Sequence, residues 1–457
     1  MTTLATRPPA VAGTFYPGDP GALAETVDAC LQLGARHAAG SQPLGGAGAR
    51  RIKAIVAPHA GYRFSGPIAG SAYAALRDQA PSIRRVVLLG PSHRVWVDGL
   101  AVTGADQWST PLGSVPVDIA ARRRLVDAGL AFVDDDAHAE EHSLEVHLPF
   151  LQRALGSFEL LPLVVGRAEP LAVANVLDAV WGGPETLIVV SSDLSHYLDH
   201  ATATRVDRAT AQLVVAGDLA HLDSDRACGA VPVRGLLLAA KEHRLRGELI
   251  DLRTSGDTSG DRDRVVGYGA FAFTESDEPL ALTTLARQAI RRALVTGRPH
   301  RSAVSELPVA WREPRAVFVT LHRRGALRGC IGTLEASEPL GIAVARAAFG
   351  AAFDDPRFAP VTAAEFAELD VVISVLDPPE PLVANSFAEL RAALRHGDGL
   401  VVTAPANRAT FLPAVWDDVA DADEFLALLW RKAGLAPGAW PAGMVVERYR
   451  ATVYAEG

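Results

Sequence analysis

The stretch Ile52-Lys53-Ala54-Ile55-Val56-Ala57-Pro58-His59 decides the fold of the first half of this chain. Its apolar, partly β-branched run is typical of a strand that is buried on both faces, and a histidine follows directly. The same order recurs at Val86 to Leu89, followed by His93, and at Leu187 to Val190, followed by His196. In open α/β sheets, ligands bind at the carboxyl ends of the strands. We therefore expect three sequence-distant histidines on one rim of a sheet, which indicates a metal site.

Helical patterns alternate with these apolar runs over the first half of the chain. Such an alternation predicts an α/β domain, in which a sheet carries helices on both faces. The run from Gly267 to Phe273 is expected to be the closing strand, and the glycine-rich stretch from Gly40 to Gly48 a loop. That loop lacks the Gly-x4-Gly-Lys-Ser/Thr order, so it is no phosphate loop. The predicted helices are Ala22 to Leu33, Ile68 to Leu76, Ile119 to Ala128 and Ala209 to Ala216.

A polar linker, Thr274 to Pro279, separates this half from a second one with a different order of elements. We therefore predict two domains, residues 1–275 and 280–457, the second of α+β class. Two apolar runs around Arg323-Arg-Gly-Ala326 predict a β-hairpin in the second domain. The predicted elements are a helix from Leu280, strands Ala316 to His322 and Leu327 to Leu334, a helix from Pro339 to Ala352, strands Leu369 to Leu376 and Gly399 to Thr403, and a helix from Ala422 to Ala433.

Charge and composition exclude several classes of function. The chain has 44 basic and 53 acidic residues, a net charge of −9, so no overall basic field draws it to nucleic acid or anionic membranes. No apolar stretch reaches the roughly 18 residues of a membrane span, and Met1 to Pro9 has no apolar core of signal-peptide type. We therefore expect a cytoplasmic protein, and arginine far outnumbers lysine, which suggests a bacterial source. The three scattered cysteines form neither a disulfide framework nor an iron–sulfur motif.

Two of the three histidines are candidate ligands of one metal ion. A neutral imidazole suits zinc, iron or copper, and a catalytic site needs only a few protein ligands and an open position. Any one such histidine alone would more often be structural, but the shared placement of all three at strand ends favours ligation. The third ligand stays open at this point between Cys228, in Ala227-Cys-Gly-Ala230, and the pair Asp193 and His196.

Acidic and histidine residues near these positions could move protons. Asp193 could orient the imidazole of His196, or both could act as general acid and base; alternatively, Asp193 caps the following turn. The segment Glu140 to His147 is also rich in such groups, and on a helix His138 and His142 would share a face. Its order is not His-Glu-x-x-His, so we expect hydrogen bonds to the ligands rather than direct ligation.

Taken together, these motifs resemble the Memo family, also called AmmeMemoRadiSam system protein B. The resemblance spans about residues 7 to 273, in the order of the family. The matching stretches are Arg7-Pro-Pro-Ala-Val-Ala-Gly-Thr-Phe-Tyr-Pro17, Pro58-His-Ala-Gly-Tyr62, Gly90-Pro-Ser-His93, Glu141-His-Ser-Leu-Glu-Val-His-Leu-Pro149, Ser191-Ser-Asp-Leu-Ser-His196 and Ala227-Cys-Gly229.

This resemblance implies a fold like that of the class III extradiol dioxygenases. In that fold two histidines and a carboxylate hold iron, and in Memo a cysteine takes the place of the carboxylate. Carried over residue by residue, the metal ligands are His59, His93 and Cys228, with Asp193 and His196 beside them. His142 is a further candidate for the acid–base chemistry. A thiolate is a softer ligand than a carboxylate, so copper or zinc becomes plausible beside iron.

The second half resembles AmmeMemoRadiSam system protein A, the AMME-syndrome-region family, over about residues 280 to 455. Its Cys330 is a further candidate site: Arg328 could activate the thiol, or the cysteine is structural in a tight hairpin. The matching residues are Leu327-Arg-Gly-Cys-Ile-Gly332, Pro339-Leu340, Ala351-Ala-Phe-Asp-Asp-Pro-Arg-Phe358, Val372-Ile-Ser-Val-Leu376, Phe411-Leu-Pro413 and Lys432-Ala-Gly-Leu435.

These resemblances imply a radical-SAM protein as the partner of the fused chain. The leading hypothesis is a metal-dependent redox protein, with iron or copper, or a component of a radical-SAM-associated modification system. Its substrate would be a small molecule or a peptide. One alternative is a binding or scaffold module that keeps the dioxygenase-like pocket without catalysis, and another is a metal-assisted hydrolase.

Overall fold

The computed structural model describes residues 4–40, 51–275, 282–299, 304, 307–366, 368–405 and 407–456. The chain divides into two compact units, Met1–Glu278 and Pro279–Gly457. Most of the predicted Gly40 to Gly48 loop and of the predicted linker lies outside the described residues. Within the described residues, no helix is both long and apolar enough to cross a bilayer.

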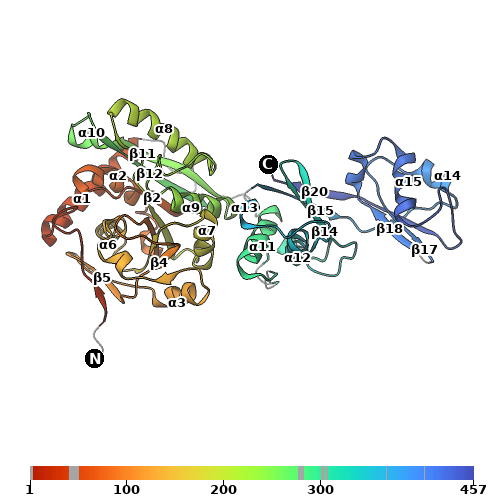
Figure 1. Ribbon diagram of the computed structural model, residues 1–457, viewed down its shortest axis with the longest axis horizontal. Coiled ribbons are helices and arrows are strands. Elements are labelled where there is room, and N and C mark those ends of the chain that lie inside the picture. The colour runs from red at the N-terminus through yellow and green to blue at the C-terminus, as the bar shows by residue number, and fades with distance from the viewer. Residues whose placement is uncertain are drawn as a thin grey trace. The chain divides into compact units, whose positions relative to one another are not determined.

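The first unit is built on one large mixed sheet (Figure 1). Its centre is parallel, in the order β2, β9, β3, β8, whereas β12 and β4 pair with its edges in antiparallel fashion. A parallel centre needs crossover connections, and these place helices on both faces. The strands of the sheet are β2 (Ile52–Ala57), β3 (Arg85–Pro91), β4 (Leu100–Val102), β7 (Phe132–Val133), β8 (Glu159–Val165), β9 (Thr186–Ser191), β10 (His196–Leu198), β11 (Leu245–Thr254) and β12 (Val265–Glu275).

Both faces of this sheet are buried, as the sequence predicts. Ile55 and Ala57 of β2 belong to one hydrophobic cluster, and Ala54 and Val56 belong to another on the opposite face. Helices α1 (Pro20–Gly40), α2 (Tyr62–Ala74) and α6 (Leu148–Leu155) contribute to the first cluster. The second cluster includes side chains of α3 (Ile119–Asp127), α7 (Pro170–Ala179), α8 (His200–Ala216) and α9 (Ala230–Glu242).

Smaller elements complete the first unit at the ends of the strands. A second sheet has the order β1, β5, β6. His138 and His142 do not share one helix, because two short helices span this segment. Glu141 has an extended backbone between them, and its side chain caps the second helix by accepting from the Ser143 N–H. These elements are β1 (Thr6–Arg7), β5 (Gln107–Thr110), β6 (Gly113–Pro116), α4 (Asp136–Ala139), α5 (His142–Glu145) and α10 (Ser255–Ser259).

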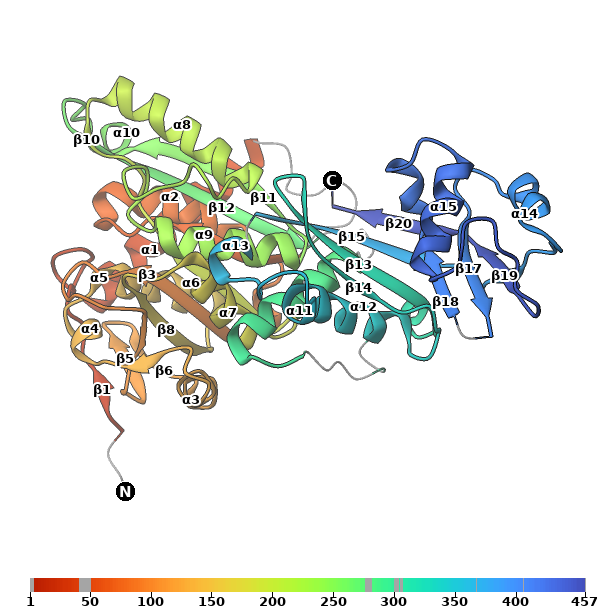
Figure 2. The same ribbon diagram turned by 45° about the vertical axis from the view of Figure 1, so that its right-hand side comes forward.

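The second unit is an α+β arrangement with two four-stranded sheets (Figure 2). The first sheet has the order β14, β13, β15, β20, and β13 pairs with β14 as the predicted hairpin. Alternate residues of β13, such as Val317 and Val319, are fully buried, and α12 contacts this strand. The elements are α11 (Leu282–Thr296), β13 (Ala316–Arg323), β14 (Ala326–Gly332), α12 (Leu340–Phe349), α13 (Ala363–Phe366), β15 (Leu369–Leu376) and β20 (Ala451–Ala455).

The second sheet of this unit has the order β16, β19, β17, β18. Its core is aromatic: Trp430 of α15 lies edge-on to Phe387 of α14, and Trp416 stacks on Phe425. The elements are β16 (Glu380–Pro381), α14 (Phe387–Ala393), β17 (Gly399–Ala404), β18 (Asn407–Phe411), α15 (Ala422–Lys432) and β19 (Val445–Tyr449). The predicted fold class, an α/β unit followed by an α+β unit, is therefore confirmed.

Candidate metal centre

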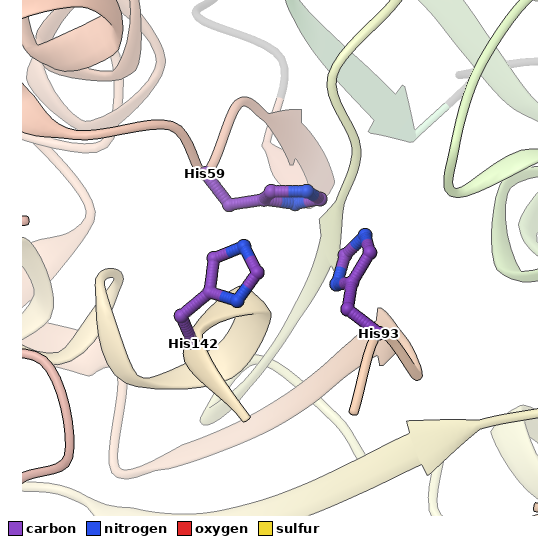
Figure 3. Close-up of side chains that lie close together, drawn as sticks. All are labelled: His59, His93 and His142. Atoms are coloured by element: carbon purple, nitrogen blue, oxygen red, sulfur yellow. The ribbon is translucent and has the colours of Figure 1, made fainter. Parts of the chain in front are cut away.

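Three histidine side chains meet at the carboxyl ends of β2 and β3 (Figure 3). His59 follows β2, His93 follows β3, and His142 is the first residue of α5. One ring nitrogen from each of them lies within 4.8 Å of the other two. Among the residues that the structure describes, this is the group of three whose geometry could hold a metal ion. The predicted convergence of His59 and His93 is present, and His142 joins them.

Hydrogen bonds fix which nitrogen of His59 faces the centre. Its Nδ1 lies 2.6 Å from the Ser191 hydroxyl, and that hydroxyl donates to the carbonyl of Ser143. Because the hydroxyl proton is engaged, Ser191 accepts from His59, and Nδ1 carries the ring proton. The Nε2 lone pair of His59 is therefore free for a cation, as in metal sites where a ligand histidine donates its other N–H.

A buried carboxylate orients His93 in the same way. Nδ1 of His93 lies 3.0 Å from Glu141 Oε1, and the backbone N–H of His93 donates to Oε2 at 2.6 Å. Burial acts to raise the pKa of Glu141, but the hydrogen bonds from His93 and Ser143 outweigh it and lower that pKa to about 2. The carboxylate is ionised, and His93 presents Nε2. Nδ1 of His142 also lies 3.3 Å from Glu141, without the alignment of a hydrogen bond.

The predicted third ligand, Cys228, lies against the same histidine. Its Sγ is 3.4 Å from His59 Nε2. The cysteine precedes α9, and its neighbour Gly229 allows the backbone to approach the strand end: a Cβ at Gly229 would lie 2.5 Å from the Ser191 carbonyl oxygen. A larger residue would hold α9 away from the centre. The contact between Cys228 and His59 thus depends on a glycine directly after the cysteine.

Asp193, in the loop after β9, contacts both His59 and Cys228. Its Oδ1 accepts the backbone N–H of His59 at 2.8 Å, and its Oδ2 lies 4.0 Å from His59 Nε2. The backbone N–H of Asp193 donates to Cys228 Sγ at 3.3 Å. Burial raises the pKa of Asp193 to about 7, although the His59 N–H stabilises its charged form. The carboxyl group can therefore gain or lose a proton near neutral pH, and the N–H that it accepts comes from His59 on another segment.

The donor set fits a soft or borderline cation. Two ligands at 2.0–2.3 Å from a tetrahedral ion are roughly 3.5 Å apart, and the contact between Cys228 and His59 matches that separation. Burial lowers the pKa of His59 well below its usual range and that of His142 to about 4, so both rings are neutral donors. Burial, followed by the charge of Asp193, raises the pKa of Cys228 to about 12. The thiolate at neutral pH therefore needs a bound cation.

The other two predicted positions are not members of this group of three. His196 starts β10 as an exposed residue, and the partial shielding of its ring from water, together with the charge of His93, lowers its pKa. Cys330 belongs to the second unit, on β14, where its sulfur accepts from the Thr320 hydroxyl at 3.3 Å. Its backbone N–H donates to Asp355. The roles of His196 and Cys330 stay predictions.

Two orienting residues were not singled out from the sequence. Ser191 ends β9 and Glu141 precedes α5, and both stand in quoted motifs, but no spacing rule assigns them to His59 and His93. The signal that could have found them is chemical: a ligand histidine nearly always donates its second N–H to a carboxylate, carbonyl or hydroxyl. Polar residues at buried strand ends are therefore the first places to look for the groups that accept this N–H.

Comparisons with known proteins agree with both resemblances. The family described as Memo-like protein matches residues 7–272, and the family described as AMMECR1 matches residues 283–454. A MEMO1 family protein of Methanopyrus kandleri is 37% identical over 284 residues, which is 58% of this chain and 98% of that protein. A MEMO1 family protein of Nitrosopumilus maritimus is 34% identical over 280 residues, 58% of this chain and 99% of that protein.

Among solved structures, an uncharacterized protein from Pyrococcus horikoshii is similar at 37% identity, covering 38% of this chain and 89% of that one, with a TM-score of 0.36. The sequence matches are what decide the family, because the Memo-like match alone spans more than half of the chain. The chain therefore belongs to the Memo-like protein family, and it carries an AMMECR1 domain fused behind the Memo-like part.

Proposed function

We propose that the first unit is a metal-dependent redox protein that binds one iron or copper ion. The observation that carries the proposal is the convergence of His59, His93 and His142 within 4.8 Å, with Cys228 3.4 Å from His59. Imidazole and thiolate donors suit both metals, and zinc would also fit them. A bound iron or copper ion would supply one-electron chemistry, which none of these side chains supplies alone.

Within this proposal His59, His93 and Cys228 are the ligands, and His142 faces the same point as an acid–base group. Ser191 and Glu141 hold the two ligand rings so that their Nε2 lone pairs converge. Such pre-orientation removes the cost of ordering the ligands when the cation binds.

Asp193 is the residue best placed to hold and release a proton. Its pKa is about 7, and its Oδ2 lies 4.0 Å from His59 Nε2. A carboxyl group whose pKa is raised by burial suits the exchange of protons with a substrate. His196, exposed on the next strand, would pass that proton to water.

A radical-SAM protein is the proposed partner, with a small molecule or a peptide as the substrate. Fusion gives the Memo-like part and the AMMECR1 domain a fixed one-to-one ratio and raises their effective concentration for each other. The AMMECR1 domain would present the substrate or the partner to the metal centre. Co-purification of a radical-SAM protein with the full chain supports this part of the proposal, and its absence under reducing, oxygen-free conditions contradicts it.

Oxygen consumption tests the redox assignment. The full chain is loaded with iron(II), copper or zinc and supplied with a thiol reductant, and oxygen uptake is followed for the wild type and the His59→Ala/His93→Ala variant. We expect uptake with iron or copper in the wild type alone, and none with zinc, which has no redox chemistry. Equal uptake by both proteins contradicts the proposal. A metal-loaded wild type that consumes no oxygen points to the hydrolase or the scaffold instead.

A further inference from the structure

A cavity of about 400 Å³ opens on the first unit. It lies between the first turn of α2, strand β10, helix α10 and strand β12, and its lining includes Arg63, Tyr197, Arg264 and Tyr268. This volume suffices for a small organic ligand, since such pockets usually measure roughly 300–1,000 Å³. None of the proposed metal ligands lines the cavity, so it is a separate feature of the unit.

Two short connections link the lining of the cavity to the segment that carries Asp193 and His196. Tyr197 follows His196, the proposed proton carrier, and His196 pairs with Val266 of β12, which also lines the cavity. Tyr268 is two residues further along β12, and the backbone N–H of Leu194, next to Asp193, donates to the carbonyl of Gly267, next to Tyr268, at 2.8 Å. A ligand in the cavity would therefore have one end near Asp193.

Two arginines give the cavity its charge. The guanidinium carbon of Arg264 lies 4.4 Å from the centre of the Tyr197 ring, and that of Arg63 lies 5.7 Å from the centre of the Phe64 ring. Within the described part of the chain neither arginine has a carboxylate partner, and Asp261 is the acidic residue of the lining. Arginine held against an aromatic ring keeps its five donors for an external oxyanion. Both guanidinium groups are thus available to a ligand.

Two further observations point to a ligand. Tyr268 is only 1% exposed and lines the cavity, yet its hydroxyl has no hydrogen-bond partner among the residues described. The hydroxyl oxygen is not one of the fully buried atoms without a partner, so it faces the cavity, where an occupant could replace the water that solvates it. Tyr197 has φ of 61°, in the left-handed region that bulky residues avoid, and it is 63% exposed at the cavity. Strain of this kind collects at ligand-binding sites.

We propose that this cavity is the substrate pocket of the metal centre and that it binds a small organic anion. Arg63 and Arg264 hold the carboxylate or phosphate group of the ligand, and Tyr268 donates a hydrogen bond toward the end near Asp193. The ring of Phe64 and the side chain of Val266 cover its apolar part. This inference rests on the proposed function only in taking the metal centre as the reacting end, since the binding of an anion requires no metal.

Calorimetric titration of the full chain tests the pocket, with benzoate and inorganic phosphate as separate probes. We expect the Arg63→Gln/Arg264→Gln variant to bind the preferred probe at least about tenfold more weakly, because two charge-assisted contacts are lost. Tyr268→Phe should weaken binding severalfold. Arg208→Gln on α8, outside the cavity lining, is the matched control and should bind as the wild type does. A preference for benzoate assigns a carboxylate ligand, and a preference for phosphate a phosphate ester.

Metal content, measured on the same samples, separates this inference from the proposed function. The arginine variant should keep its metal, and the His59→Ala/His93→Ala variant should lose metal but keep probe binding. The inference is overturned if the wild type binds neither probe, or if the arginine variant binds both as the wild type does. Equal metal in the wild type and the histidine variant overturns the proposed function and leaves the anion result to be judged by itself.

Discussion

The carboxylate of Glu141 accepts the Nδ1 proton of His93 at 3.0 Å and the backbone N–H of the same residue at 2.6 Å. One side chain thus determines the tautomer of the His93 ring and also holds the backbone at His93 in place. Replacement of such a partner typically lowers metal affinity by about 10- to 100-fold. We therefore predict that Glu141→Gln weakens metal binding in this range, as measured by competition with a chromogenic chelator.

The neighbouring Glu140 provides the control for this experiment, because its side chain is exposed. Glu140→Gln removes the same charge from the same segment without touching a ligand, so its metal affinity should equal that of the wild type. If the two variants bind metal equally, the carboxylate has no orienting role.

The identity of the third ligand can be read from a spectrum. A copper(II) ion bound by Cys228 should show a sulfur-to-metal charge-transfer band, because thiolate is a strong electron donor. We predict that Cys228→Ser loses this band, whereas His142→Gln keeps both the band and the metal but loses turnover. A band that survives in Cys228→Ser would remove this cysteine from the ligand set and favour the three-histidine group.

A buried ion pair anchors the N-terminal segment to the helix that carries His142. Nη1 of Arg7 lies 2.6 Å from Glu145 Oε2, and Glu145 also accepts from the Tyr16 hydroxyl and two backbone N–H groups. Removal of one partner leaves an uncompensated buried charge, which typically costs about 3–5 kcal/mol. We predict that Arg7→Ala lowers the free energy of unfolding by this amount in urea titration.

The exposed pair of Arg167 and Asp98 is the matched control for Arg7. Water screens that pair, so Arg167→Ala should hardly change the unfolding midpoint. A similar loss in both variants would mean that burial of the Arg7 pair adds nothing to the stability of the first unit.

The buried His138 should make the free energy of unfolding depend on pH in the acid range. Burial, followed by the charge of Arg7, lowers its pKa from 6.5 to about 4, and its Nδ1 is buried without a partner. A histidine with a depressed pKa stabilises the folded state above the unfolded pKa, and this contribution is lost as the pH falls from 6.5 toward 4. It amounts to roughly 3 kcal/mol. Unfolding of His138→Gln should depend less on pH over this window than that of the wild type.

The exposed His221 provides the comparison variant, because His221→Gln removes an imidazole without changing the buried site of His138. Other buried histidines titrate in the same direction, so the difference between the two variants is the quantity to compare. Identical pH dependence in His138→Gln and the wild type would contradict a role for burial at this position.

The fold of the first unit could be predicted from the sequence, because its central strands are short apolar runs, rich in β-branched residues, that alternate with helical patterns. The β2 strand has the predicted bounds, Ile52–Ala57, and β15 of the second unit also has its predicted bounds, Leu369–Leu376. The segment from His138 to His142 was less predictable. Its local pattern suits a helix, but the tertiary hydrogen bonds of Glu141 to His93 favour an extended residue there.

The candidate site could be predicted only in part, for a physical reason. The rule that ligands bind at strand ends brings His59 and His93 together, because parallel strands end on one edge. Nothing local places Cys228 or Ser191, since each contact with His59 joins residues more than 130 positions apart in the sequence. Such contacts depend on how a helix or a neighbouring strand packs, which periodicity does not encode.

The most direct test of the central claim is the metal content of the full chain, measured by elemental analysis after aerobic and anaerobic purification. About one iron or copper ion per chain is expected in the wild type. The His59→Ala/His93→Ala variant should be nearly metal-free while it keeps the unfolding midpoint of a folded protein. Equally low metal in both proteins, after loading with iron, copper and zinc in turn, would contradict this claim.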